Sequence, residues 1–153
     1  MFLRPMNDSD LDAVLAIETA ATEFPWSLSQ FADCVQSEDS ATVLEVDNSI
    51  CGFSIFQRVI DECSLLNIVV HPKKQAQGFG RLILEHGLGE QSRAGVLKCF
   101  LEVRISNIRA QSLYRSMGFH KVGVRKNYYP GLNEREDALV MSRQLPQALL
   151  ETV

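Results

Sequence analysis

The sequence lacks several features that define other classes of protein. None of its apolar runs approaches the roughly 20 residues that a membrane-spanning helix needs. Its first residues, MFLRPMNDSD, do not form the basic region and the apolar region of a signal peptide. We therefore expect a cytoplasmic protein that does not contact a membrane.

The cysteines lack the spacing of a metal site or a redox motif. The four thiols include no C-x-x-C pair and no Cys/His cluster at zinc spacing; they are Cys34, Cys51, Cys63 and Cys99. Isolated thiols with apolar neighbours are typical of reduced residues in a protein core. The sequence therefore predicts reduced, buried thiols and no metal ion.

Positive charge is also scarce. Lys and Arg number 15 against 19 Asp and Glu, which gives a formal net charge of −4. This balance disfavours a broad nucleic-acid-binding surface, so we expect no direct nucleic-acid partner, and it suits a cationic partner such as an amine or a basic peptide. No repeat, low-complexity tract or linker interrupts the chain, and residues 1–153 are expected to form a single domain.

The apolar pattern predicts an α/β (α+β) fold with the order β-α-α-β-β-β-α-β-α-β-β. A mixed, mostly antiparallel central sheet flanked by helices would result. Ser27 with Gln30 forms a capping-box signature for the second helix. Ser106 or Asn107 caps the last helix, and Gly118 is suited to end it. The expected strands cover residues 2–4, 41–46, 50–60, 63–70, 97–103, 121–128 and 137–143, and the third helix covers residues 78–93.

Glycines open and interrupt this third helix. Gly87 and Gly89 lie in its interior, where each costs about 1 kcal/mol relative to alanine. Gly78 and Gly80 lie at its start, where unpaired backbone N–H groups and the helix dipole suit a phosphate. A packing pair of glycines would give the same pattern. The segment is not a Walker loop, and Ile83 stands where a dinucleotide-binding motif would have its third glycine.

Two sequence motifs, which follow one another in the order expected of one family, make the prediction of a phosphate site more specific. The pattern Q-x-x-G-x-G, from Gln75, resembles the pyrophosphate-binding motif of the GNAT family of acetyl-CoA-dependent N-acetyltransferases. The pattern N-x-x-A-x-x-L-Y-x-x-x-G-F, from Asn107, resembles a later motif of the same family. The resemblance implies the GNAT fold, with acetyl-CoA as cosubstrate.

Four further segments resemble the bacterial RimI subfamily, whose enzymes acetylate the N-terminal alanine of a small-subunit ribosomal protein. They are FPWS from Phe24, LEVRISN from Leu101, RKNYYP from Arg125 and REDALVM from Arg135. The resemblance covers residues 2–145. It implies a ribosomal-protein N-terminus as peptide substrate, whose amine attacks the thioester directly.

The resemblance also implies roles for individual residues. Glu102 would accept the proton of the amine and Tyr114 would donate one to the departing thiolate; the alternatives are a salt-bridged glutamate, paired with Arg104, and a core tyrosine. Substrate contacts would come from three aromatic residues that could also be simple packing: Trp26, Tyr128 and Tyr129. Cofactor contacts would come from the backbone of the strand end, whose side chains would be core, and from the loop and the two helix starts. These residues are Ile68, Val69, Val70, Gln75, Ala76, Gln77, Gly78, Phe79, Gly80, Arg81 and Asn107.

Two other functions remain open at this point. A GNAT enzyme with another acceptor, a small-molecule amine or a lysine, would keep the cofactor motif. A non-enzymatic acyl-CoA-binding module would keep it without using Glu102 and Tyr114. An N-terminal α-amino group, with a reference pKa of about 7.7–8.0, needs less help to lose its proton than a lysine near 10.4. The chemistry therefore suits an N-terminal substrate.

Overall fold

The computed structural model describes residues 1–37 and 39–146, so residues 147–153 of the predicted domain lie outside the described residues. The predicted order of elements is confirmed, with two additional short 3-10 turns at Asp8–Asp10 and Pro72–Lys74. The helices are α1 (Leu11–Ala21), α2 (Leu28–Gln36), α3 (Phe79–Arg93) and α4 (Ile108–Ser116). The strands are β1 (Phe2–Pro5), β2 (Ser40–Val46), β3 (Ser49–Val59), β4 (Glu62–Val70), β5 (Lys98–Arg104), β6 (His120–Tyr129) and β7 (Glu136–Gln144).

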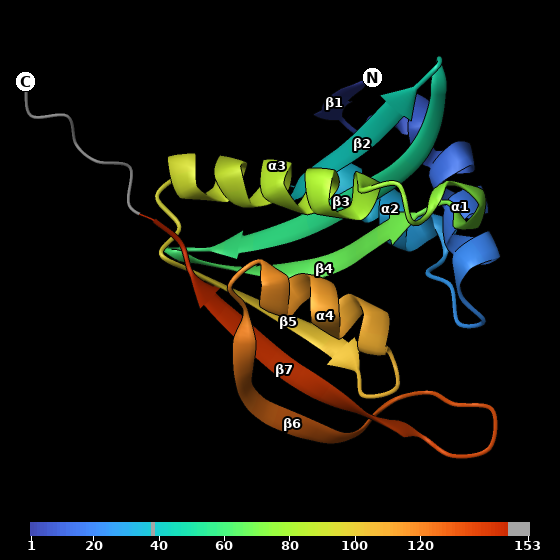
Figure 1. Ribbon diagram of the computed structural model, residues 1–153. Helices are drawn as coiled ribbons and strands as arrows, with labels where there is room; N and C mark the ends of the chain where they lie inside the picture. Colours follow the sequence, from blue (N-terminus) through green and yellow to red (C-terminus); the bar gives the residue numbers. More distant parts are fainter. Residues whose placement is uncertain (38, 147–153) are drawn as a thin grey trace, which may run out of the picture.

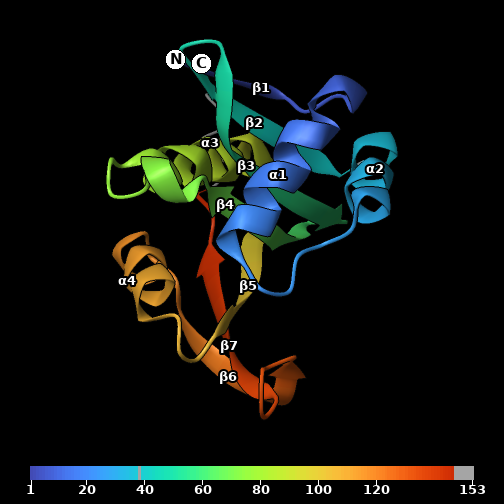
Figure 2. The same cartoon turned by 90° about the vertical axis from the view of Figure 1, so that its right-hand side faces the viewer.

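The strands form one sheet in the order β1-β2-β3-β4-β5-β7-β6 (Figure 1). Neighbours are antiparallel except β4 and β5, which are parallel. Helices α1 and α2 cover one face, and α3 and α4 lie on the other (Figure 2). None of the described helices combines the length and the apolar character that crossing a membrane requires.

Alternation along β3 divides the core between these two faces. Phe53 and Ile55 pack with buried residues of α1 and α2. Phe56 points the other way and packs with buried residues of α3 and α4. All four cysteines are buried and free, as the sequence predicted.

The local signals for the helix ends act as expected. The Ser27 side chain accepts a hydrogen bond from the Gln30 amide, and the Gln30 side chain accepts one from the Ser27 amide. The Asn107 side chain accepts from the Ala110 amide at the start of α4. Gly118, with φ of +91°, follows that helix in the left-handed conformation that glycine adopts without strain. These caps fix where α2 and α4 begin and end.

Gly87 has a packing role that helix propensity alone does not reveal. A Cβ at this position would overlap Cε2 of Phe56, whose side chain is fully buried. The glycine therefore allows α3 to approach β3 closely. Gly89 differs, because a Cβ there would meet the flexible Arg93 side chain at 3.3 Å.

We expect different stability changes from Gly87→Ala and Gly89→Ala. The first should lower the free energy of unfolding by about 1–3 kcal/mol, because the methyl group overpacks the core against Phe56. The second should leave it unchanged or raise it by up to about 1 kcal/mol through helix propensity. Urea unfolding measures both variants. Equal stabilities would show that the Phe56 ring yields to the added methyl group.

Candidate active site

The parallel strands β4 and β5 are paired over only part of their lengths. Their register joins Glu62–Leu65 to Lys98–Leu101, and beyond it the two strands diverge (Figure 1). The pairing of β4 with β3 passes from Leu65 to Asn67, which leaves Leu66 as a bulge at the point of divergence. A bulge bends its strand and strengthens the local twist. The C-terminal half of β4 therefore turns away from β5 and leaves an opening beside it.

A cavity of about 430 Å³ lies at this opening, on the face of the sheet that carries α3 and α4. All the predicted cofactor residues line it except Val69 and Gln77, and Tyr114 lines it too. The Val69 side chain packs instead against the core under α1 and α2, because alternate residues of a strand face opposite sides. The lining also includes four residues that were not predicted to contact a cofactor: Lys74, Arg109, Ala110 and Leu113.

The start of α3 forms one end of this cavity. Ala76 and Gly78 both have positive φ, of 63° and 85°, and Gly78 is the N-cap residue. Glycine has no side chain that could cap the first N–H groups of α3, so these groups stay available to a ligand. The cations Lys74, Arg81 and Arg109 lie around them. This combination of free amides, a helix dipole and positive side chains fits the pyrophosphate of acetyl-CoA.

Gln75 connects the two sides of the cavity. Its Nε2 donates to the Val70 carbonyl at 3.1 Å, and its Oε1 accepts from Arg109 Nη1 at 3.3 Å. Because Val70 ends β4 and Arg109 lies in α4, this one side chain spans the opening. The sequence motif predicted Gln75 but not its Arg109 partner.

Tyr114 lies on the buried side of α4. Its side chain is 6% exposed, packs against Phe119 with ring centroids 6.0 Å apart, and still lines the cavity. Burial raises the pKa of the phenol to about 12, and the nearby Cys99 thiol adds to this. The phenol therefore keeps its proton across the physiological pH range.

Glu102 does not line this cavity, because it points to the opposite face of β5 from the buried Leu101 and Val103. Its carboxylate, 25% exposed, forms an ion pair with Arg125, with 2.9 Å between Oε1 and Nε. A hydrogen bond to Glu102 raises the pKa of the Tyr128 phenol. The pKa of the Tyr129 phenol is raised mainly by burial, and the negative charge of Glu102 adds to this effect. Glu102 thus lies among Tyr128, Tyr129 and Arg125. The sequence suggested Arg104 as its partner, whereas the structure pairs it with Arg125.

The conformation of β6 explains how both tyrosines reach Glu102. The register of β6 with β7 shifts between Arg125 and Tyr129, and Asn127 has a φ of 53°. The Asn127 amide donates to Asp137 Oδ1 at 2.9 Å, and the Arg135 side chain donates to the Asn127 and Tyr128 carbonyls. These bonds hold the irregular segment in place. The RKNYYP and REDALVM segments are therefore parts of one structural unit.

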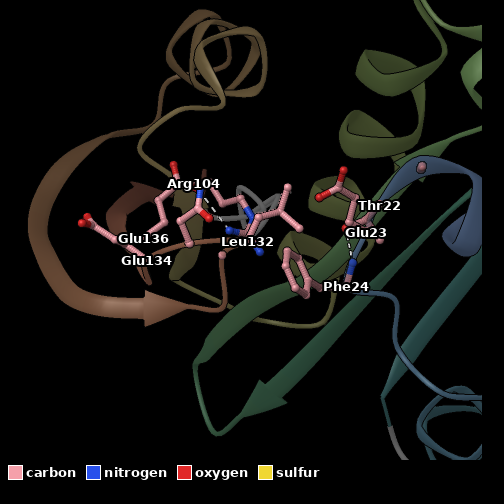
Figure 3. Close-up of a pocket in the computed structure, with 10 residues that line it drawn as sticks. Thr22, Glu23, Phe24, Arg104, Leu132, Glu134 and Glu136 are labelled. Atoms are coloured by element: carbon pink, nitrogen blue, oxygen red, sulfur yellow. Dashed lines mark hydrogen bonds and ion pairs between the residues drawn. The ribbon is translucent and has the colours of Figure 1, made fainter.

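A second cavity, of about 760 Å³, opens between the loop after α1 and the loop joining β6 to β7 (Figure 3). It is lined by Ala21, Thr22, Glu23, Phe24, Arg104, Gly131, Leu132, Asn133, Glu134 and Glu136. None of the three predicted substrate residues is among these. Trp26 packs on Phe31 with ring centroids 5.2 Å apart, although Tyr129 contacts Arg104 in the wall of the cavity. Sequence reasoning missed Phe24 and Arg104, which lie within the FPWS and LEVRISN segments.

A buried glutamate holds the loop after α1 in place. Glu18, 3% exposed, accepts hydrogen bonds from the Trp26 amide at 2.9 Å and from Asn67 Nδ2 at 3.2 and 3.3 Å. Asn67 follows the bulge in β4, so the carboxylate joins the loop to the opening in the sheet. No motif predicted this contact. In the described part of the chain, no cluster of three or more His, Cys, Asp or Glu residues is arranged to hold a metal ion.

Comparison with known proteins identifies the family of this chain. Residues 37–121 match the acetyltransferase (GNAT) domain. The chain belongs to the GNAT family. It is 42% identical over 137 residues to the [ribosomal protein bS18]-alanine N-acetyltransferase of Escherichia coli K12, a match that covers 90% of this chain and 93% of that protein. The GNAT chain is therefore an acyltransferase.

Solved structures agree with this assignment. The crystal structure of the ribosomal-protein-S18-alanine N-acetyltransferase from Escherichia coli superposes with a TM-score of 0.91 at 39% identity, covering 99% of this chain and 98% of that one. The Salmonella typhimurium protein yncA, solved with its cofactor acetyl-CoA, superposes with a TM-score of 0.83 at 19% identity, covering 96% and 95% of the two chains. The second likeness extends to the fold alone.

Proposed function

We propose that this GNAT enzyme transfers the acetyl group of acetyl-CoA to the N-terminal alanine of ribosomal protein bS18. The observation that carries the proposal is the position of the two cavities on either side of the opening between β4 and β5. One is built from α3 and α4, and the other from the loop after α1 and the β6–β7 loop. A donor and a peptide acceptor could thus approach the same point from opposite faces. The names of the relatives with about 40% identity support the acceptor.

The residues of the first cavity would hold acetyl-CoA. The free amides at the start of α3, with Lys74, Arg81 and Arg109, would bind the phosphates. The edge of β4 at Ile68–Val70, which has no β5 partner, would bind the pantetheine arm as an added strand binds. When bound, the cosubstrate supplies a thioester carbonyl that a neutral amine can attack.

Glu102 and Tyr114 would handle the protons of this reaction. A carboxylate oxygen of Glu102 would take the proton of the acceptor α-amine, whose reference pKa of about 7.7–8.0 makes a moderate base sufficient. The Tyr114 hydroxyl, which a pKa of about 12 keeps protonated, would donate its proton as the thiolate departs. Glu102 points to one face of β5, and Tyr114, on α4, lies over the other face. This arrangement matches the approach of acceptor and donor from two sides.

We expect Gly80→Asp to weaken acetyl-CoA binding more than Gly80→Asn. A Cβ at this position would lie 3.6 Å from Leu113 and 3.9 Å from Val70. The aspartate or asparagine side chain would therefore enter the first cavity without a backbone clash. Asparagine matches aspartate in shape, and the difference between the two isolates the repulsion between carboxylate and phosphate. Titration calorimetry should show roughly tenfold weaker binding for aspartate than for asparagine, and less at high salt. Equal affinities would place the phosphates elsewhere.

The proposed function is tested with peptides that differ only at their first residue. The protein is incubated with acetyl-CoA and each peptide, and the rate of acetylation is read by mass spectrometry. We expect the peptide beginning with alanine to be modified fastest. Faster modification of an Nα-blocked peptide with a free lysine would indicate a lysine acetyltransferase. Acetyl-CoA binding without transfer to any amine would indicate a non-enzymatic binding module.

A further inference from the structure

Arg104 lies at the point where the two walls of the second cavity meet. It follows Glu102 by two residues on β5, so both side chains point to the same face of the sheet. Its guanidinium carbon lies 5.3 Å from the ring centroid of Phe24, in the loop after α1, and 4.6 Å from that of Tyr129, at the end of β6. Figure 3 shows Phe24 and Arg104 within one cavity.

Hydrogen bonds connect the same guanidinium to the β6–β7 loop. Arg104 Nη1 donates to the Pro130 carbonyl at 2.9 Å and to Glu136 Oε1 at 3.1 Å. The other carboxylate oxygen of Glu136 accepts from the Ser106 amide at 2.7 Å. Arg104 is therefore hydrogen-bonded to one wall and lies over an aromatic ring from the other. A planar guanidinium suits both kinds of contact better than the compact ammonium group of lysine does.

The hydrogen bonds of the loop after α1 hold its backbone. Glu18 anchors the backbone at Trp26, and the Phe24 amide donates to Thr22 Oγ1 at 3.1 Å. Both bonds fix the backbone of the loop. Neither orients the Phe24 side chain, which is partly exposed and reaches across to Arg104.

We propose that Arg104 is a positioning residue that ties the two walls of the second cavity together and so preorganises this cavity for the acceptor peptide. The proposal rests on the proposed function, because it takes the second cavity as the place where the peptide binds. Without the tie, each wall would have to be ordered when the peptide binds, and that cost would appear as weaker binding. Arg104 would touch neither the reacting amine nor the thioester, so the chemical step would continue at nearly the same rate.

The variants are Arg104→Met, Arg104→Lys, Phe24→Leu and the double variant Arg104→Met/Phe24→Leu. Arg4→Lys is the matched control. Arg4 also lies on a strand, is 26% exposed like Arg104, and bonds two carboxylates, Asp10 and Glu45, far from the cavity. If Arg104→Met does not fold, Arg104→Lys replaces it in each comparison, because it keeps the charge and loses the planar stack.

Two measurements test the proposal. Hydrogen–deuterium exchange should become faster in residues 22–26 and 130–135 of Arg104→Met and not in Arg4→Lys. With a peptide beginning with alanine, Arg104→Met should raise the KM for peptide about tenfold, change kcat less than about twofold and leave the KM for acetyl-CoA unchanged. The double variant should be no worse than Arg104→Met, because both substitutions break the same contact.

Each outcome decides one part of the proposal. Unchanged exchange in both segments overturns the tie, whatever the kinetics. Faster exchange with an unchanged KM for peptide overturns the positioning role, and so do multiplicative losses in the double variant. If the unmodified protein acetylates no peptide, the proposed function fails by itself. The exchange measurement then still decides whether Arg104 ties the walls.

Discussion

Replacing Tyr114 by phenylalanine should lower kcat by roughly 10²–10⁴-fold, which is the usual contribution of a general acid. The phenol is the proposed proton donor; it lines the cavity that would hold the thioester, and burial raises its pKa to about 12. Phenylalanine keeps the ring and its edge-to-face contact with Phe119, so the core stays packed. The melting temperature should therefore be unchanged.

Steady-state kinetics and thermal unfolding measure these two effects separately. Met117→Leu is the matched control, because Met117 is also buried against this core and the swap nearly conserves volume. The control should keep its kcat. The pH dependence of kcat gives a second check. An acid with a pKa of about 12 keeps its proton as the pH rises past 10, so kcat should not fall near pH 10. An unchanged kcat in Tyr114→Phe would show that Tyr114 is a core residue and not the acid.

Glu102→Gln should slow turnover by about 100-fold at low pH, with a smaller effect at high pH. Below its pKa of about 7.7–8.0 the acceptor α-amine is protonated, and removing that proton requires a base. Above it the amine is already neutral, and the loss of the carboxylate matters less. Acetyl-CoA affinity should stay unchanged, since Glu102 faces away from the cofactor cavity.

The control for this prediction is Glu45→Gln, which removes a partly buried carboxylate paired with Arg4 at the far end of the sheet. It should leave the pH–rate profile unchanged. The measurement is kcat/KM for the peptide from about pH 6 to about pH 9. A Glu102→Gln profile that runs parallel to that of the unmodified protein would show that another group takes the proton.

Local sequence signals predicted most of the fold. Ser27 with Gln30, Asn107 and Gly118 act through hydrogen bonds and backbone preferences within a few residues, and such signals can be interpreted without a structure. The glycine motif before α3 is equally local. Gly87 shows the limit of this reasoning: its propensity suggests a weak point in a helix, whereas its function depends on Phe56, which is distant in sequence.

The contacts that complete the candidate site could not be predicted in the same way. Arg104 meets Phe24 across 80 residues of chain, Glu18 meets Asn67 across 49, and Arg125 replaces Arg104 as the partner of Glu102. These pairs depend on strand register, on the bulge in β4 and on the irregular segment of β6. Register and bulges follow from the packing of the whole sheet.

The proposed acceptor is an N-terminal α-amine, and a peptide with two kinds of amine distinguishes it from a lysine. A single peptide carries both a free N-terminal alanine and a free internal lysine. After incubation with the protein and acetyl-CoA, fragmentation by tandem mass spectrometry locates the acetyl group. We expect acetylation of the alanine α-amine with the lysine unmodified. Acetyl groups found on the lysine in place of the α-amine would contradict it.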